Sequence, residues 1–412
     1  MNFRGGAGML KKWKVIFKTL SPIHIKGQKP DYGSGIIRLG RKGYIINEIK
    51  LSKFLKEKDL IECYVEYVSQ CIKNRKKPFI VFFFNQYKNR IRLDEITLKN
   101  ISSGITSIGD GNSFICNGNG TYFIPGSSIK GAIRTSLIYH MLNELKNSNQ
   151  KEFNGLVIDT INRKLTEYNI AKKKYEWRKM DDIKKSFDET IIAKEFQSFF
   201  NDLVKIAKVK EGPNTDLLRT LKISDSKKIN DVYKENIKVV CYKNDSSFYF
   251  GKTKQKNTTE EEISLNVECL HEDTEFITEV SLDLGLLNKF YPDGKMPFND
   301  ISSLINIIKE FGERQWIEER DFFQKVQGMQ KTTEFYNQNI FHPLLRVGWG
   351  TGMLGTTIDL LLDPPLRQRI RNEVMGHNRP GLPAPHSKRI VMRDNLATFP
   401  LGWVKIETLK EE

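Results

Sequence analysis

The chain has 412 residues, of which 39% are hydrophobic and 11% aromatic, a composition typical of a folded protein with room for two domains. It contains no apolar run near the roughly 18 residues that span a bilayer, so we expect no membrane partner. Its five cysteines form no Cys-x-x-Cys pair, which argues against structural zinc and a disulfide framework and favours a reducing, cytoplasmic location.

The net charge of +16 is distributed unevenly along the chain. Residues 1–100 hold 22 basic and 8 acidic side chains, so this quarter alone carries an excess of 14 positive charges. Such asymmetry predicts a polyanionic partner, most simply a nucleic acid. The alternative is a lysine-rich surface that binds nothing, and charge alone leaves it open.

The first quarter of the chain mixes strand and helix patterns. Residues Trp13 to Ile25 alternate like a strand and end near His24. Residues Leu51 to Ile72 have helical periodicity, and the apolar run Phe79 to Phe84 has the length of a buried strand. The order of elements favours an α+β fold.

The segment from Tyr122 to Leu142 carries the strongest motif. A short β-rich run meets Pro125 and Gly126, and a helical apolar pattern follows, so Ser127 or Ser128 is the expected N-cap. Lys130 and Arg134 are four residues apart and share one face of this helix. Free amides at a helix N-terminus beside two cations suit a phosphate, although such joints also occur without a ligand.

Two enzymatic motifs match parts of this segment. Ser127 and Lys130 fit the Ser-x-x-Lys pattern of serine acyl-enzymes, but that chemistry also needs Ser-Asp-Asn and Lys-Thr-Gly elements. The chain offers only Ser224-Asp225-Ser226 and has no Lys-Thr-Gly. The Walker A pattern fails as well on this segment, because Lys130 is followed by Gly131 and does not stand in a Gly-Lys pair followed by Ser or Thr.

The remainder divides into an insertion and a second half. Residues 146–215 are helical and charged, so we predict a helical insertion within an N-terminal domain of residues 9–230. Residues 231–412 form the predicted C-terminal domain. Strand, helix, strand pair, helix and strand recur in both halves, which suggests two ferredoxin-like sandwiches. Later elements are expected at Leu217–Ser224, Ile263–Leu270, Phe276–Leu284, Ile301–Gln330, Leu344–Val347, Thr356–Leu362 and Trp403–Glu407.

A second glycine-rich stretch runs from Arg346 to Gly355. Its Gly-x-Gly-x-x-Gly pattern at Gly350, Gly352 and Gly355 lacks the second parallel strand and the acid of a dinucleotide site. We interpret it instead as a backbone that must come close to a ligand, with Gly348, Gly350 and Gly352 permitting several amides to point at one anion. Trp349 offers a stacking face, although burial is the more usual fate of a tryptophan. Lys388 and Arg389 add a basic loop.

Taken together, these motifs resemble one family. Gly126, Ser128, Lys130, Gly131 and Arg134 match the Gly-x-Ser-x-Lys-Gly-x-x-Arg loop of the RAMP superfamily of CRISPR proteins. Leu20 to Gly27 looks like the first-strand signature of that superfamily. The distal stretches Arg346–Thr357, His386–Ile390 and Pro400–Ile406 look like those of the fifth subunit of the type III-A (Csm) effector complex. The resemblance extends over residues 11–407.

The resemblance implies two RRM-like domains and a non-catalytic, RNA-binding subunit. It implies a head position that binds the 3′ region of CRISPR RNA, caps the backbone filament and supports 3′-end maturation in antiviral defence. The partners implied are CRISPR RNA, target RNA, the backbone and small subunits, and host nucleases. No cofactor, metal or catalytic residue is expected, and the RNP1 pattern is absent. The expected RNA contacts are Gly126, Ser127, Ser128, Lys130, Gly131, Arg134, His24, Arg346, Gly348, Trp349, Gly350, Gly352, Lys388 and Arg389.

Two alternatives stay open. In the first, the chain is a metal-independent endoribonuclease, in which His24 is the general acid or base and Lys130 stabilises the phosphorane. In the second, it is a protein-interaction adaptor that docks through the 146–215 insertion.

Overall fold

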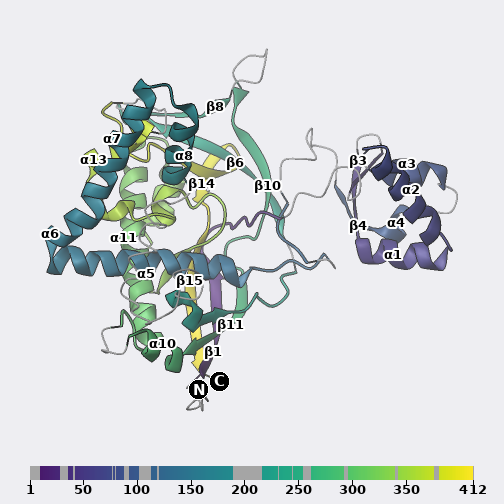
Figure 1. Cartoon of the computed structure of the whole chain (residues 1–412), viewed down its shortest axis with the longest axis horizontal. Coiled ribbons are helices and arrows are strands. Elements are labelled where there is room, and N and C mark those ends of the chain that lie inside the picture. Colours follow the sequence, from purple (N-terminus) through teal and green to yellow (C-terminus); the bar gives the residue numbers. More distant parts are fainter. Residues whose placement is uncertain are drawn as a thin grey trace. The chain divides into compact units, whose positions relative to one another are not determined.

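The computed structural model describes most of the chain (Figure 1). Described are residues 10–27, 36–39, 42–76, 78, 80–87, 92–101, 113–117, 120–188, 216–230, 232–243, 245–253, 261–291, 296–338, 342–374 and 380–411. The chain divides into two compact units. Unit 1 comprises residues 1–24, 124–227 and 233–412, and unit 2 comprises residues 25–123 and 228–232.

The first sheet of unit 1 is antiparallel, with strand order β12-β15-β1-β11-β5. In its centre, Trp13, Val15 and Phe17 alternate inward, and the ring of Phe17 stacks on Phe276 with centroids 5.2 Å apart. Burying such side chains stabilises the fold by about 1.5–3 kcal/mol each. The strands are β1 Leu10–Thr19, β5 Leu221–Ile223, β11 Glu275–Asp283, β12 Leu344–Arg346 and β15 Trp403–Glu411.

The second sheet of unit 1 is also antiparallel and has the order β10-β6-β13-β14, with β7 paired to β6. An aromatic core that includes Trp316, Phe323, Tyr336 and Trp403 packs with Val240 and Ile390 of this sheet. The strands are β6 Tyr233–Tyr242, β7 Phe248–Phe250, β10 Ser264–Cys269, β13 Ser387–Arg393 and β14 Leu396–Pro400, and a separate pair is β8 Lys252–Thr253 with β9 Glu261–Glu262.

Two long helices of unit 1, α5 and α11, pack against each other, with the rings of Tyr139 and Phe311 5.1 Å apart. A capping box at Asp300 and Ser303 begins α11. The helices are α5 Gly126–Ser148, α6 Gln150–Phe153, the π-helical η1 Asn154–Ile158, α7 Asp159–Lys173, α8 Trp177–Asp188, η3 Leu217–Thr220, α10 Leu284–Phe290, α11 Ile301–Gln324, α12 Gln330–Tyr336, η4 Met353–Gly355, η5 Asp359–Leu361 and α13 Pro364–Val374. Residues 189–215 of the expected insertion lie outside the described residues.

Unit 2 is a small mixed α and β body. Leu51, Phe54 and Leu55 of its first helix form a core with Phe83. The predicted strand at Phe79–Phe84 is wrong, because residues from Ile80 onward form a helix. Ile80 and Phe83, one turn apart, are buried, whereas Phe82 is 64% exposed, and a short apolar run does not distinguish this period from that of a strand. The elements are β2 Ile36–Leu39, β3 Lys42–Ile46, α1 Glu48–Glu57, α2 Ile61–Lys73, α3 Ile80–Gln86, α4 Leu93–Ile96 and β4 Thr97–Ile101.

The two units do not follow the division expected at residue 230. Strand β1 lies between β15 and β11, so the beginning and the end of the chain share one sheet. Unit 1 therefore contains residues from both expected domains, and residues 25–123 form unit 2 as an excursion between β1 and α5. Alternation along β1 shows that it is a strand but does not show which strands flank it.

Candidate nucleic-acid interface

Helix α5 begins two or three residues earlier than the sequence indicated. Pro125 occupies the N-cap position, with φ −62° and ψ 132°, and its own side chain makes no capping hydrogen bond, so the N-cap predicted at Ser127 or Ser128 is wrong. The backbone amide of Ser128 instead donates to the Pro125 carbonyl at 2.9 Å. Tyr122 of the expected strand forms only isolated bridges, to Cys116 and Ile229.

Gly126 is the point of closest approach between α5 and β5. A Cβ on this residue would lie 2.1 Å from the Ile223 carbonyl oxygen, which no side chain tolerates. Its amide donates to Asp225 Oδ1 at 2.9 Å, and the Ile124 amide donates to Ser226 Oγ at 2.9 Å. The Ser224-Asp225-Ser226 stretch therefore positions the start of α5, and the Asp225 carboxylate already occupies part of this helix N-terminus.

The two cations of α5 have different surroundings. Arg134 forms an ion pair with Asp216, whose Oδ1 also accepts from the Leu218 amide at 2.9 Å. Lys130 makes no hydrogen bond or ion pair with any residue that the structure describes. Partial burial lowers the pKa of Lys130, against the opposing effect of Asp216. On the face of α5 that Lys130 and Arg134 share, the half-buried Lys130 is therefore available to an anionic partner.

The second glycine-rich stretch is a tight loop that follows β12. Gly350 and Gly352 have φ values of 90° and 73°, and a Cβ on Gly350 would also lie 2.6 Å from Leu401 Cδ1. Only glycine adopts such a backbone readily. After Gly352 the chain enters the short 3-10 helices η4 and η5 rather than an α-helix, so this is not a dinucleotide fingerprint.

Both glycine-rich motifs line one cavity of about 580 Å³ in unit 1. Helix α5 contributes two serines, Gly131 and Arg134, and the distal loop contributes glycines and threonine hydroxyls. A Cβ on Gly131 would meet no atom within 4 Å, so packing within the described chain does not require glycine there. The lining residues are Ser127, Ser128, Gly131, Ala132, Arg134, Thr135, Ile138, Arg346, Gly348, Thr351, Gly355, Thr356, Thr357 and Ile358. The cavity thus offers hydroxyls, the two arginines Arg134 and Arg346, and close backbone to a ligand.

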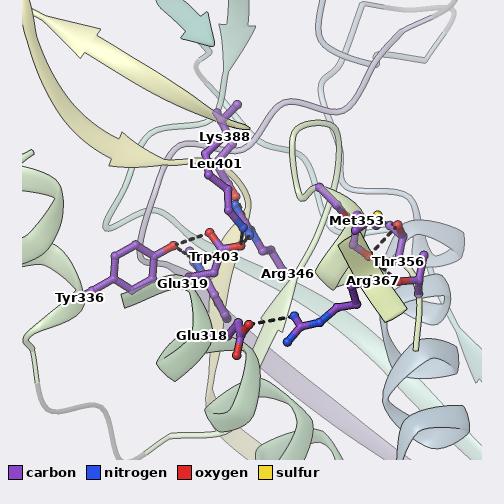
Figure 2. A network of polar contacts seen from close by, with 12 residues as sticks. Glu318, Glu319, Tyr336, Arg346, Met353, Thr356, Arg367, Lys388, Leu401 and Trp403 are labelled. Atoms are coloured by element: carbon purple, nitrogen blue, oxygen red, sulfur yellow. Dashed lines mark hydrogen bonds and ion pairs between the residues drawn. The ribbon is translucent and has the colours of Figure 1, made fainter. Parts of the chain in front are cut away.

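Beneath the distal loop lies a buried charge cluster (Figure 2). Glu319 of α11 is 1% exposed and pairs with Arg346 at 3.0 Å and with Lys388. Burial alone would raise the pKa of Glu319, but the two cations outweigh it and hold the pKa below its usual value. Tyr336 donates to Glu319 at 3.4 Å and accepts from Trp403 Nε1 at 3.0 Å. Arg346 and Lys388, expected to contact RNA, are thus engaged with protein groups.

The cluster also fixes the distal loop. Arg346 Nε donates to the Leu401 carbonyl at 3.0 Å, and the guanidinium lies 5.4 Å from the Trp403 ring. Next to Glu319, Glu318 pairs with Arg367 at 2.8 Å. Arg346 lines the cavity as well, so the same side chain joins the buried cluster to the candidate site.

His24, Trp349 and Arg389 form a separate stack. His24 is 2% exposed, and its Nδ1 lies 2.7 Å from the Glu268 carbonyl, so this nitrogen carries the proton. The imidazole meets Trp349 edge to face at 5.7 Å, and the exposed Arg389 guanidinium lies 4.7 Å from the centre of that indole ring. The Trp349 amide donates to the His24 carbonyl at 2.7 Å. His24 therefore holds the loop in place.

The structure brings some predicted residues together and leaves others apart. Of the expected RNA contacts, Ser127, Ser128, Gly131, Arg134, Arg346 and Gly348 line the cavity. Sequence reasoning missed the threonines Thr351, Thr356 and Thr357 and the acids Asp216, Asp225 and Glu319. The threonines had a signal, because they stand within or beside the glycine-rich motif.

A larger cavity of about 740 Å³ lies between α11, the loop before α13 and the chain before β13. It is lined by charges of both signs, several of which neutralise one another, such as Arg367 with Glu318 and Arg314 with Glu318 at 3.6 Å. Among the expected RNA contacts, only Lys388 lines it. Volume alone does not make it the better candidate.

The described residues contain no group of three or more His, Cys, Asp or Glu side chains that could hold a metal ion. No helix among them is long and apolar enough to cross a membrane.

Comparison with known proteins identifies related chains. The family model of the RAMP superfamily matches residues 16–329. A Streptococcus thermophilus protein named "CRISPR system Cms protein Csm5" is 31% identical over 138 residues. That alignment covers 31% of this chain and 38% of the relative.

Two solved structures resemble the chain over nearly its full length. One comes from the cryo-EM structure of a Csm-crRNA-target RNA ternary complex of a type III-A CRISPR-Cas system. It has a TM-score of 0.54 and 20% identity, and the match covers 96% of this chain and 100% of that one. The other, the crystal structure of T. onnurineus Csm5, has a TM-score of 0.47 and 19% identity, with 95% and 100% covered. The similarity to the chain of the ternary complex is a similarity of fold.

Proposed function

This chain belongs to the RAMP superfamily, and on that premise we propose that it is a non-catalytic RNA-binding subunit of a type III-A Csm complex. In this role it binds the 3′ region of CRISPR RNA, caps the backbone filament and supports 3′-end maturation in the cytoplasm. Its partners are CRISPR RNA, target RNA, other Csm subunits and the nucleases that trim the guide. The likeness to a chain of a Csm-crRNA-target RNA complex and the Csm5 relative support the assignment.

One observation carries the proposal, namely the shared cavity of the two glycine-rich motifs. Residues more than 200 positions apart converge on it with hydroxyls, two arginines and glycines that leave the backbone accessible. Such a surface binds phosphates and ribose without sequence-specific contacts to the bases. Lys130, on the same helix face as Arg134, adds a cation with no described partner.

The proposed domain architecture is two RRM-like RAMP folds, each built around one sheet of unit 1. Because β1 lies between β15 and β11, the two folds would interleave along the chain. Helix α5 and the distal loop would then bring one glycine-rich motif from each sequence half to a common RNA surface.

The environment of His24 supports a role without catalysis. Its ring is 2% exposed and its Nδ1 is engaged by a backbone carbonyl, so it lacks the access that a general base for RNA cleavage needs. We therefore place His24 among the groups that position the distal loop.

Removing the two cations of α5 tests the proposal. We expect the purified Lys130→Ala/Arg134→Ala variant to bind a labelled single-stranded CRISPR RNA more weakly. The slope of log affinity against log salt should become shallower by about 1.4, or about 0.7 for each lost phosphate contact. Lys130→Ala alone breaks no described bond, whereas Arg134→Ala also leaves Asp216 unpaired, so both need a circular dichroism check.

The matched control is Lys289→Ala/Lys331→Ala, which removes two exposed lysines of unit 1 and the same net charge. An equal loss of affinity in both double variants would mean that overall charge, and not this face of α5, holds the RNA.

Gly131→Ala is expected to stabilise the fold and, at the same time, to weaken RNA binding. Replacing an exposed helical glycine by alanine should raise the free energy of unfolding by about 0.5–1 kcal/mol, because no described atom obstructs the methyl group. RNA affinity should nevertheless fall several-fold, since the methyl group projects from a residue that lines the cavity.

Gly155→Ala is the control, as Gly155 is also helical, exposed and unobstructed but lies outside this cavity. Stabilisation of both variants with unchanged RNA affinity of Gly131→Ala would remove Gly131 from the interface.

A further inference from the structure

The turn that joins α7 to α8 exposes two large aromatic side chains. Tyr175 is 73% exposed and Trp177 65% exposed, and their ring centres are 6.2 Å apart. The other four tryptophans of the chain are buried or half-buried. An exposed aromatic pair of this kind indicates a binding surface, because burying either ring within the protein would stabilise the fold.

Hydrogen bonds within the backbone hold this turn, on which both aromatic side chains are exposed. Tyr175 follows the last turn of α7 with a φ of 56°, a left-handed conformation that usually falls to glycine at this position. Its amide donates to the Lys172 carbonyl at 3.2 Å, and the Trp177 amide donates to the Tyr175 carbonyl at 2.9 Å. A bulky residue therefore occupies a position where glycine would be less strained.

The aromatic pair is surrounded by positive charge. Residues 172–179 contain five basic side chains and one acidic side chain, and all eight residues are exposed. The acid, Glu176, lies 3.7 Å from Lys179. Cores of protein interfaces are depleted in lysine, whereas surfaces that bind single-stranded nucleic acid combine cations with aromatic faces.

The hairpin that presents this turn is anchored in unit 1. Helix α7 buries Ile161, Leu165, Tyr168 and Ala171. Asn169 donates to Glu373 of α13 at 2.7 Å, and Arg369 donates to Asn162 at 2.9 Å. The aromatic pair therefore stands on a fixed support, which lowers the entropic cost of binding.

We propose that residues 172–179 form a second RNA contact, in which bases of single-stranded RNA stack on Tyr175 and Trp177 while the neighbouring lysines contact phosphates. This inference extends the proposed RNA-binding function, but it uses residues that do not line the 580 Å³ cavity. Stacking of this kind tolerates any base sequence, since every base has a π-face.

The test is Tyr175→Ala/Trp177→Ala in the full chain, titrated with a labelled single-stranded RNA. Each stacked base contributes about 1–3 kcal/mol, so we expect affinity to fall at least tenfold. Tyr175→Phe/Trp177→Phe should retain most of the affinity, and Phe82→Ala, which removes another exposed aromatic ring, should leave it unchanged. In the unsubstituted chain, RNA should also quench Trp177 fluorescence, and Trp177→Phe should abolish that signal.

The outcomes separate an RNA contact at this turn from an RNA contact at the cavity of the two glycine-rich motifs. Weak binding of the alanine pair, together with weak binding of Lys130→Ala/Arg134→Ala, supports two contacts on one RNA. A defect of the aromatic variant alone supports the turn and contradicts the cavity. Unchanged RNA affinity of the aromatic variant overturns the proposal. This holds also if that variant no longer assembles with other subunits, because the turn would then contact protein and not RNA. An equal loss for duplex RNA also overturns it, because stacked bases are not accessible in a duplex.

Discussion

Glu319→Ala is expected to destabilise unit 1 by about 3–5 kcal/mol, because it leaves Arg346 and Lys388 as buried charges without a counterion. Glu319 lies at the centre of a cluster that joins α11, β12 and β13, so the loss extends to the distal glycine-rich loop. All five tryptophans belong to unit 1, and their fluorescence during chemical denaturation reports its unfolding. We expect a clear shift of the midpoint to lower denaturant concentration.

Glu313→Ala is the matched control on the same helix. Glu313 is half exposed and lies 3.8 Å from Lys309, and such surface pairs contribute at most about 1 kcal/mol. Glu319→Gln/Lys388→Met should recover part of the stability lost in Glu319→Gln, because it removes one of the orphaned cations. Equal midpoints for Glu319→Ala and Glu313→Ala would show that the buried cluster does not stabilise the fold.

Gly126→Ala has the second largest expected effect. The added methyl group would lie 2.1 Å from the Ile223 carbonyl oxygen and 2.7 Å from that of Ser224. Both atoms belong to backbone, and β5 is held to β11 by the register of Val280 with Ile223, so neither can rotate away. Overpacking costs about 1–3 kcal/mol, and we expect a value near the upper end.

Gly131→Ala, five residues farther along α5, should have the opposite sign, which makes it an internal comparison of glycine removal in one helix. The measurement is again the denaturation midpoint from tryptophan fluorescence. A Gly126→Ala variant as stable as the unsubstituted chain would mean that α5 and β5 do not approach as closely as described.

Local patterns predicted much of the fold. Alternation at Trp13, Val15 and Phe17 indicated β1, and the apolar spacing after Gly126 indicated α5, because both periods are properties of neighbouring residues. The same reasoning failed for Ile80–Gln86, where a continuous apolar run has no period to distinguish the two structures. It also failed for the N-cap, since the Asp225 carboxylate meets the Gly126 amide from 99 residues away.

The candidate site, too, could be predicted from local patterns only in part. Each glycine-rich motif was predicted as a ligand-binding loop, but their convergence on one cavity depends on the packing of α5 beside β12. Glu319 falls on the buried stripe of α11, between Trp316 and Phe322, but nothing local indicates that Arg346 and Lys388 converge on it. Long-range pairing of charges follows from the tertiary fold and is not encoded in spacing.

The most direct test of the RNA interface is to locate bound RNA on the chain. Single-stranded RNA containing 4-thiouridine would be bound, crosslinked with light and mapped by mass spectrometry of the attached peptides. We expect crosslinks to peptides that contain residues 126–135 and 346–358, with fewer of both in Lys130→Ala/Arg134→Ala. Crosslinks confined to unit 2, with none at either glycine-rich motif, would contradict it.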